Sequence, residues 1–232
     1  MATETSMGGE RRAFEPTRWS VILDARRGSK TALSDLVAAY WKPAYFYVRR
    51  WGAGVEDAKD LTQGFFGEFL RRDFLKDVAR ERGRFRTFLL TALRHHLVNE
   101  AEAARAKKRG GGKAALSLDF AEAEGRYRVS KEAPEAVFHR EWALTVLELA
   151  LQALAREMPR DRFDVVRAHL SPGEAPSYEE TSRRLATTVT DVKNLLHRAR
   201  KRYRELIRAE VRAGVREDSE VDAEVRDLFA FL

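Results

Sequence analysis

The sequence has no cysteine, only six prolines in 232 residues, and no long apolar run. The absence of cysteine excludes disulfides, thiolate metal sites and cysteine nucleophiles, and it is compatible with a reducing cytoplasm. No apolar stretch approaches the roughly 18 to 20 residues that span a bilayer, and residues 1–12 lack the apolar core of a secretion signal. We therefore predict a cytoplasmic protein with no membrane insertion.

Patterns typical of β-strands are also scarce. Few alternating runs of β-forming residues occur, and nearly every segment carries apolar residues at helical spacing. The hydrophobic content of 44% is enough to build real cores. We predict an all-α fold with two small helical domains joined by a flexible linker, the C-terminal one a helix-turn-helix.

Charge is present in excess and is unevenly distributed. The formal net charge is +7, but residues 214–232 hold two arginines against six carboxylates, a charge of −4, so the first 213 residues carry +11. A body with this charge would attract a polyanion, and the binding would weaken steeply as salt rises.

The most informative stretch is 177–207, SYEETSRRLATTVTDVKNLLHRARKRYRELI. Ser177 and Glu180 fit a capping box at the start of a short helix, residues 186–189 break that helix, and Thr190 can cap a second one. Residues 190–212 carry eight basic against three acidic side chains. The second helix has an apolar stripe of period 3.6, formed by Val192, Leu195, Leu196, Ala199, Tyr203, Leu206 and Ile207.

Two helices joined by a short turn are typical of DNA-binding proteins. The first residues of the second helix enter the major groove, while later cationic side chains lie against phosphates. The alternative is a solvated basic helix in an unrelated bundle. On the first interpretation the DNA-contacting residues are Thr190, Asp191, Lys193, Asn194, His197, Arg198, Arg200 and Lys201.

The N-terminal part is predicted to hold four helices. The first starts near Trp19 with Thr17 as its cap, and the second runs from Ala32 to Val48 and ends at the glycines of 52–54. Residues 55–70 form an aromatic helix whose far face is acidic. The helix after Gly83 has an inward stripe of Phe85, Phe88, Leu89, Ala92, Leu93, His96 and Leu97.

Residues 110–134 are predicted to be the flexible linker. Three consecutive glycines flanked by lysines cannot hold a packed element, and the residues up to Pro134 are mixed polar without a period. The pattern GxxxxGK[ST] is absent, so the glycines are not a phosphate-binding loop. The linker separates domains predicted over 1–109 and 135–213, and the second domain begins with helices over 137–155 and 163–170.

Catalysis is not expected. His95 and His96 point about 100° apart on a helix and cannot easily share a metal, and the remaining histidines have no metal-binding spacing. Glu56, Asp57 and Asp60, at i, i+1 and i+4, are more typical of a partner-binding or solvated face than of a nuclease cluster. We predict no catalytic residue, no metal ligand and no cofactor.

The order of these segments resembles the extracytoplasmic-function sigma factors. The resemblance covers roughly 33–109 and 137–209, through DAKDLTQGFFGEFL, then FRTFLLTALRHHLVNEAEAARAKKR, then the helix-turn-helix. The third family motif resembles SYxEIAxxLxxSVxTVKxxLHRARxxLRxxL. It is matched here by Ser177, Tyr178, Glu180, Leu185, Val189, Val192, Lys193, Leu196, His197, Arg198, Ala199 and Arg200. This chain departs from the family at Phe88, where a tryptophan is usual, and at His95, where an asparagine is common.

The resemblance implies a bacterial transcription initiation factor that binds core RNA polymerase and promoter DNA. The C-terminal domain would read the −35 element and sit on the polymerase flap, and an anti-sigma factor or other regulator is a further candidate partner. The clamp coiled coil of the polymerase would be bound by Glu56, Asp57, Asp60 and Gln63. The −10 element would be gripped by Arg94, His95, Asn99, Arg105, Lys107 and Lys108.

Two other functions and one segment stay open. A stand-alone helix-turn-helix regulator would need no polymerase, and a helical adaptor with a basic surface would select no promoter. We expect residues 214–232 to be a solvated acidic tail. The alternative is an amphipathic helix that folds against a basic DNA-binding surface and holds the factor off, using Val221, Val225, Leu228, Phe229 and Leu232.

Overall fold

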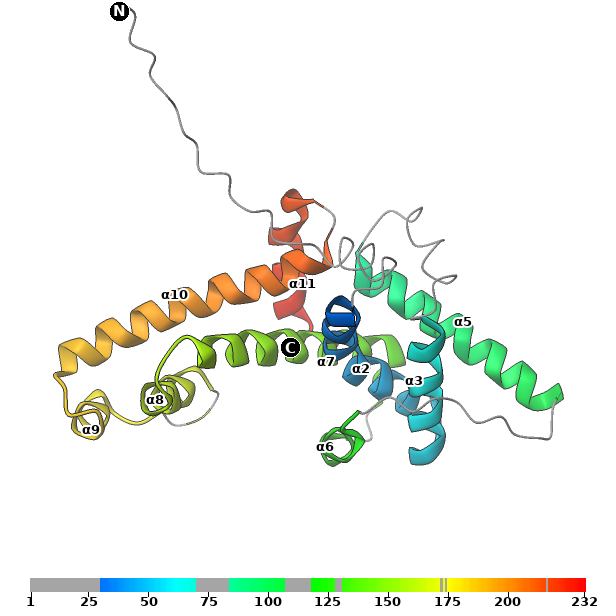
Figure 1. Cartoon of the computed structure of the whole chain (residues 1–232), viewed down its shortest axis with the longest axis horizontal. Coiled ribbons are helices and arrows are strands. Elements are labelled where there is room, and N and C mark those ends of the chain that lie inside the picture. Colours follow the sequence, from blue (N-terminus) through cyan, green and yellow to red (C-terminus); the bar gives the residue numbers. More distant parts are fainter. Residues whose placement is uncertain are drawn as a thin grey trace, which may run out of the picture.

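The computed structural model describes residues 30–69, 84–106, 118–127, 131–171, 173, 175–215 and 217–232. Every regular element in these ranges is helical, as predicted. The helix expected near Trp19 lies outside them. No described helix is both long and apolar enough to cross a bilayer. The elements (Figure 1) are α2 (Lys30–Trp51), α3 (Val55–Phe69), α5 (Phe85–Ala106), α6 (Phe120–Arg126), α7 (Pro134–Arg156), α8 (Arg160–Leu170), α9 (Tyr178–Arg184), α10 (Val189–Gly214), the 3-10 helix η1 (Asp218–Glu220) and α11 (Val221–Ala230).

The long helices α7 and α10 pack against each other along the long axis of the molecule (Figure 1). At one end lie α2, α3 and α5, with α6 beside α2; together with the first half of α7 we call this the aromatic half. At the other end lie α8 and α9, which with the second half of α7 and the first half of α10 form the aliphatic half. Helix α7 is therefore common to both.

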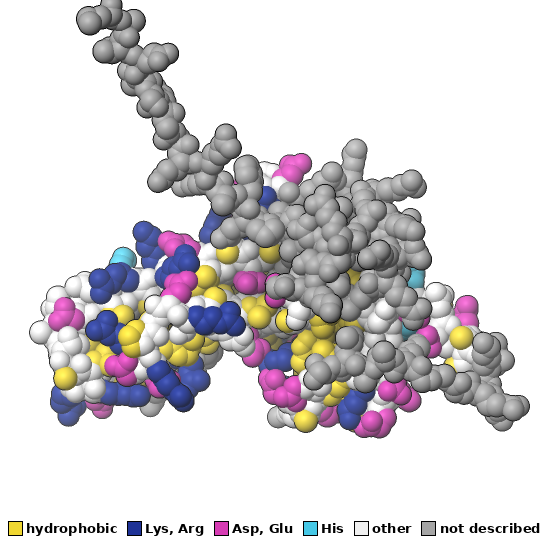
Figure 2. Space-filling view, in the orientation of Figure 1, with side chains coloured by type: hydrophobic (Ala, Val, Ile, Leu, Met, Phe, Trp, Pro, Cys, Tyr) yellow, Lys and Arg dark blue, Asp and Glu magenta, His cyan; other side chains and the backbone are white. Residues whose placement is uncertain are grey.

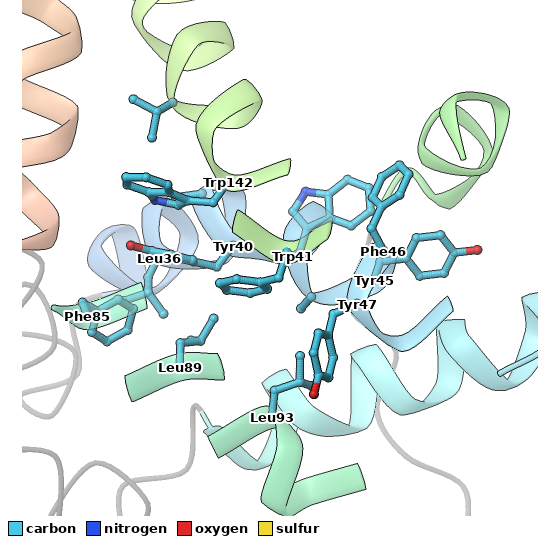
Figure 3. Packing of buried hydrophobic residues seen from close by; sticks show 14 of the residues in the cluster. Leu36, Tyr40, Trp41, Tyr45, Phe46, Tyr47, Phe85, Leu89, Leu93 and Trp142 are labelled. Atoms are coloured by element: carbon cyan, nitrogen blue, oxygen red, sulfur yellow. The ribbon is translucent and has the colours of Figure 1, made fainter. Parts of the chain in front are cut away.

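The aromatic half is built around α2, whose side chains lie buried against α5 and α7 (Figure 3). The ring centroids of Tyr40 and Phe85 are 5.1 Å apart, and those of Tyr47 and Phe138 are 6.4 Å apart, both pairs edge to face. Burial of one such large apolar side chain contributes about 1.5–3 kcal/mol, and edge-to-face contact adds to that. The large core is thus an interlocked set of rings from helices distant in the sequence.

Helix α6 lies within the predicted linker, so the expectation of an unstructured segment was wrong for residues 118–127. Asp119 caps the helix, because its side chain accepts a hydrogen bond from the backbone N–H of Glu122 at 3.1 Å. Phe120 is buried with its ring 5.0 Å from that of Tyr45. Glu124 accepts two hydrogen bonds from Arg49, at 3.0 and 2.9 Å, which hold the pKa of Glu124 below its usual value.

Helix α7 contributes to two clusters of buried residues, although we predicted that it belongs to the C-terminal domain alone. Phe138 and Trp142, near its start, lie in the large core with the side chains of α2. Leu154, near its end, lies in a second, smaller cluster with Val166 and Leu196. The proposed domain boundaries remain a prediction, but the large core does not stop at residue 134.

The C-terminal segment forms a docked helix, so the expectation of a solvated tail was wrong for the described residues after 214. Val221 and Leu228 of α11 are buried against α7 and α10, and Val225 is half-buried. Phe229 stays 55% exposed, so the apolar side of α11 is only partly used. The amphipathic alternative was right that the segment forms a docked helix, but Leu232 of its predicted stripe is exposed as well, and the role in holding the factor off stays a prediction.

Candidate nucleic-acid interface

Helix α9 begins with the predicted capping box. The backbone N–H of Glu180 donates to Ser177 Oγ at 3.1 Å, and the backbone N–H of Ser177 donates to Glu180 Oε2 at 2.8 Å. The bonds that the Glu180 carboxylate accepts from the backbone N–H and the hydroxyl of Ser177 lower its pKa. On the inner side, Thr181 is fully buried and its hydroxyl lies 3.2 Å from His169 Nε2 on α8. Helix α9 is therefore fixed both at its start and against its neighbour.

The turn between α9 and α10 is tight and contains a left-handed residue. Ala186 has φ of +47°, and the backbone N–H of Thr187 donates to the carbonyl of Ser182 at 3.0 Å. Non-glycine residues adopt this conformation uncommonly and at a cost, so the surrounding contacts must hold it. The turn sets the direction in which α10 leaves α9.

Helix α10 starts one residue after Thr188, so the prediction that Thr190 caps it was wrong. Thr188 Oγ1 accepts from the backbone N–H of Asp191 at 3.1 Å. The Asp191 carboxylate accepts in return from the hydroxyls of Thr187 and Thr188, at 3.0 and 2.7 Å, which lowers its pKa. Asp191 is thus engaged in the cap, while Thr190 is an exposed residue of the first turn.

The predicted apolar stripe of α10 faces inward, as expected. Val192, Leu196 and Ala199 are buried, and they join Leu154 and Val166 in the smaller cluster. Further along, Ile207 belongs to the large core. One helix therefore spans both halves, as α7 does.

All eight residues predicted to contact the −35 element are exposed on α10. The ammonium of Lys193 lies 5.7 Å from the ring of Tyr178, which orients it beside α9. Arg202, further along α10, is engaged in an ion pair, because it donates two 2.8 Å hydrogen bonds to Glu157 at the C-terminal end of α7. In Figure 2, Lys and Arg side chains gather over the end of the molecule that holds α8, α9 and the start of α10.

Helix α5 presents the second predicted DNA-contacting set. Arg94, His95 and Asn99 are exposed, whereas the apolar stripe on the other side is buried apart from the half-buried Phe88. Arg105 is in the last turn, but its side chain, like Lys107 and Lys108, lies outside the described residues. The structure therefore describes the side chains of three of the six predicted −10 residues, and all three lie on the exposed side of α5.

Helix α3 carries the predicted polymerase-binding face. Glu56, Asp57 and Asp60 are exposed and Gln63 is half-buried, while Phe65, Phe66 and Phe69 point into the core. The Glu56 carboxylate accepts from Lys59 at 2.7 Å, one turn away on the same helix. The acidic face is thus open to a basic partner.

Searches for related proteins found no matching family model, no matching curated protein and no matching solved structure.

Within the described part of the chain, sequence reasoning missed one group of potential metal ligands. Glu68, His96 and Glu100 each place a ligand atom within 4.8 Å of the others, and His96 is buried. Only His96 and Glu100 share a helical spacing, at i and i+4 on α5, and Glu68 comes from α3, so the spacing could not reveal the group as a whole. His96 Nδ1 lies 2.9 Å from Glu68 Oε2, so this carboxylate is already a hydrogen-bond partner. The group fits a structural contact between α3 and α5.

Proposed function

We propose that this chain is a transcription initiation factor of the extracytoplasmic-function sigma type. The observation that carries the proposal is the joint exposure of three chemically distinct faces. These are the eight residues on α10, the polar and basic residues on α5, and the carboxylates on α3. A simple DNA-binding regulator needs only the first of them.

Each face has the chemistry that its role requires. Duplex readout at the −35 element uses the first turns of α10 for base edges and its later cations for phosphates. Opening the −10 element requires polar contacts to unstacked bases and cations along the displaced strand, which Arg94, His95 and Asn99 offer. The carboxylates of α3 suit a basic coiled coil, because complementary charge steers association and fixes its register.

Run-off transcription with core RNA polymerase on genomic fragments tests the proposal. We expect specific start sites that appear only when this protein is added. Asp57→Arg with Asp60→Arg should abolish polymerase binding in a pull-down, because the acidic face then repels a basic partner. Asp35→Arg with Glu102→Arg makes the same charge change at exposed sites on α2 and α5 and should leave the pull-down unchanged. Absence of start sites, together with intact polymerase binding by the Asp57/Asp60 variant, would defeat the proposal.

A stand-alone helix-turn-helix regulator is the second candidate. It is favoured by the α9–α10 unit, which is the most completely described of the three faces. A regulator of this class would protect a defined DNA site without polymerase. Footprinting of the protein alone therefore separates the two, since the initiation factor is expected to protect promoter DNA only with polymerase present.

A further inference from the structure

Helix α11 packs beside the end of α10 and the first half of α7 (Figure 1), and its side chains reach Arg86 at the start of α5. It contacts these elements through buried apolar side chains, among them Val221 and Leu228, and through a set of ion pairs. Four carboxylates of η1 and α11 pair with four arginines, which come from α10 and from the start of α5. The carboxylates are those of Asp218, Asp222, Glu224 and Asp227. We call these arginines the arginine cluster: Arg84, Arg86, Arg208 and Arg212.

Arg86 is the most enclosed member of the cluster. It is 4% exposed and donates to both carboxylate oxygens of Glu224, at 2.5 and 3.1 Å. Its guanidinium lies between the rings of Trp142 and Phe231, 4.9 and 5.0 Å from their centroids. Only Trp142 belongs to the body of the protein, so without α11 the guanidinium would be stacked on one ring and open on the other side.

The other three arginines lie nearer to solvent. Arg84 pairs with Glu224 at 2.8 Å and also with Asp227. Arg208 pairs with Asp222 and Arg212 with Asp218, and both of these carboxylates are more than 60% exposed. Exposed pairs of this kind contribute little to stability, and buried ones offset their own desolvation only in part. These ion pairs therefore add little to what the burial of Val221 and Leu228 contributes to holding the ten-residue helix in place.

The positions of the arginines suit a different ligand. His197, Lys201, Arg208 and Arg212 fall at i, i+4, i+11 and i+15, so they lie along one side of α10. This stripe begins among the predicted −35 residues and ends beneath η1 and α11. Arg84 and Arg86 stand at the entry to α5, the helix of the predicted −10 set. The guanidinium fork binds phosphate with the geometry that it uses for carboxylate.

We propose that the arginine cluster is a binding surface for the phosphate backbone of duplex DNA, and that the carboxylates of residues 218–227 occupy the phosphate positions. The ligand identity rests on the proposed function. In the docked state the cluster is neutralised, and DNA contact is limited to the first part of α10 and to α5. Release of α11 joins these regions through a continuous cationic stripe.

Neutralising the three carboxylates that lie nearer to solvent than Glu224 tests the proposal in the full chain. Asp218→Asn, Asp222→Asn and Asp227→Asn together remove the competing charges and leave the buried Glu224–Arg86 pair in place. The control, Asp35→Asn, Glu102→Gln and Asp161→Asn, makes the same charge change at exposed positions on α2, α5 and α8. With a short labelled duplex in fluorescence anisotropy, we expect the first variant to bind on the order of tenfold more tightly than the control. Equal affinities would overturn the proposal.

A crosslink tests the same point from the opposite direction. The chain has no cysteine, so Arg208→Cys with Asp222→Cys, an exposed pair in contact, introduces the only two thiols. A short bis-maleimide then fixes α11 to α10, whereas a monofunctional maleimide modifies the same thiols without linking the two helices, so that α11 can still dissociate. We expect the crosslinked protein to bind duplex DNA several-fold more weakly than the singly modified one. Identical binding would contradict an occluding role for α11.

Failure of this inference can be distinguished from failure of the proposed function. If run-off transcription succeeds and neither test changes DNA affinity, the inference alone fails. If both tests change DNA affinity and no polymerase-dependent start sites appear, the inference stands and the initiation-factor proposal fails.

Discussion

The two halves of the molecule hold their helices together in different ways. The aromatic half buries interlocked rings from α2, α5, α6 and α7. The aliphatic half has a small cluster of Leu154, Val166, Val192, Leu196 and Ala199, and it depends on side-chain caps at Ser177 and Thr188. Local stability follows buried apolar area, so α9 and the start of α10 should open at lower free energy than α2 does. The surface that carries the predicted −35 residues is therefore the less stable part.

Phe138→Ala should cause the largest loss of stability, and it acts on the aromatic half. Phe138 is fully buried on α7 and packs against Tyr47, so its truncation leaves a cavity in the large core. We expect the free energy of unfolding to fall by about 3–5 kcal/mol. Urea unfolding followed by circular dichroism measures the loss. A change below about 1 kcal/mol would show that the core repacks around the missing ring.

Leu196→Ala should have a smaller and more local effect. Leu196 is 1% exposed in the smaller cluster, and its truncation should lower stability by about 2–4 kcal/mol. Because the large aromatic core lies in the other half, amide exchange should accelerate in α9 and the start of α10 while α2 stays protected. Uniform acceleration along the chain would mean that the two halves unfold as one unit.

His139 should make the contact of α11 sensitive to pH. Burial and the charge of Arg86 lower the pKa of His139 to about 4, from an ordinary value of 6.5. Arg84 opposes its protonation as well, while Glu135 and Asp227 favour it. The unfolded chain therefore binds this proton at a higher pH than the folded chain, so stability is complete above pH 6.5 and declines as the pH falls toward 4.

A His139→Gln variant isolates this contribution. The stability difference between wild type and variant, measured by urea unfolding from pH 7 to 4.5, should change in favour of the variant as the pH falls. Because His139 stacks on Phe231 at 4.8 Å, exchange of the α11 amides should rise in wild type over the same range. A pH-independent difference would show that His139 titrates normally.

The smallest change in the free energy of unfolding is expected for Thr188→Ala and Thr190→Ala. Comparing the two variants tests which residue caps α10. Thr188 makes the cap, so its loss should cost about 1 kcal/mol, whereas exposed Thr190 should cost less than half of that. Thermal unfolding of the two variants gives the comparison. A larger loss of stability in the Thr190→Ala variant would show that Thr190 caps α10, as the sequence predicted.

The sequence was sufficient to predict features that depend on residue spacing within one long helix or at its start. The inward stripes of α5 and α10 and the capping box at Ser177 follow from spacings of three and four residues, which depend only on helical geometry. The cap at Thr188 was missed because Thr188 and Thr190 both satisfy the same local rule. Helix α6 was missed because seven mostly polar residues show no reliable period.

Contacts between distant segments could not be predicted in this way. Arg86 and Glu224 are 138 residues apart, and no local spacing connects them. The same holds for Tyr45 and Glu124, whose 2.6 Å hydrogen bond ties α6 to α2. Amphipathic spacing gave α11 only as the alternative to a solvated tail, because its docking surface depends on the apolar and cationic side chains that other helices bring to it.

The continuity of α7 has a consequence for promoter architecture under the proposed function. Its 23 residues extend for about 34 Å, close to one turn of B-form DNA, and its ends are packed into different clusters. Helix α7 would then fix the distance between the predicted DNA-contacting faces of α5 and α10. The protein would therefore tolerate little variation in the number of base pairs between the −10 and −35 elements. Lengthening α7 by one helical turn would move the preferred spacer by about one to two base pairs.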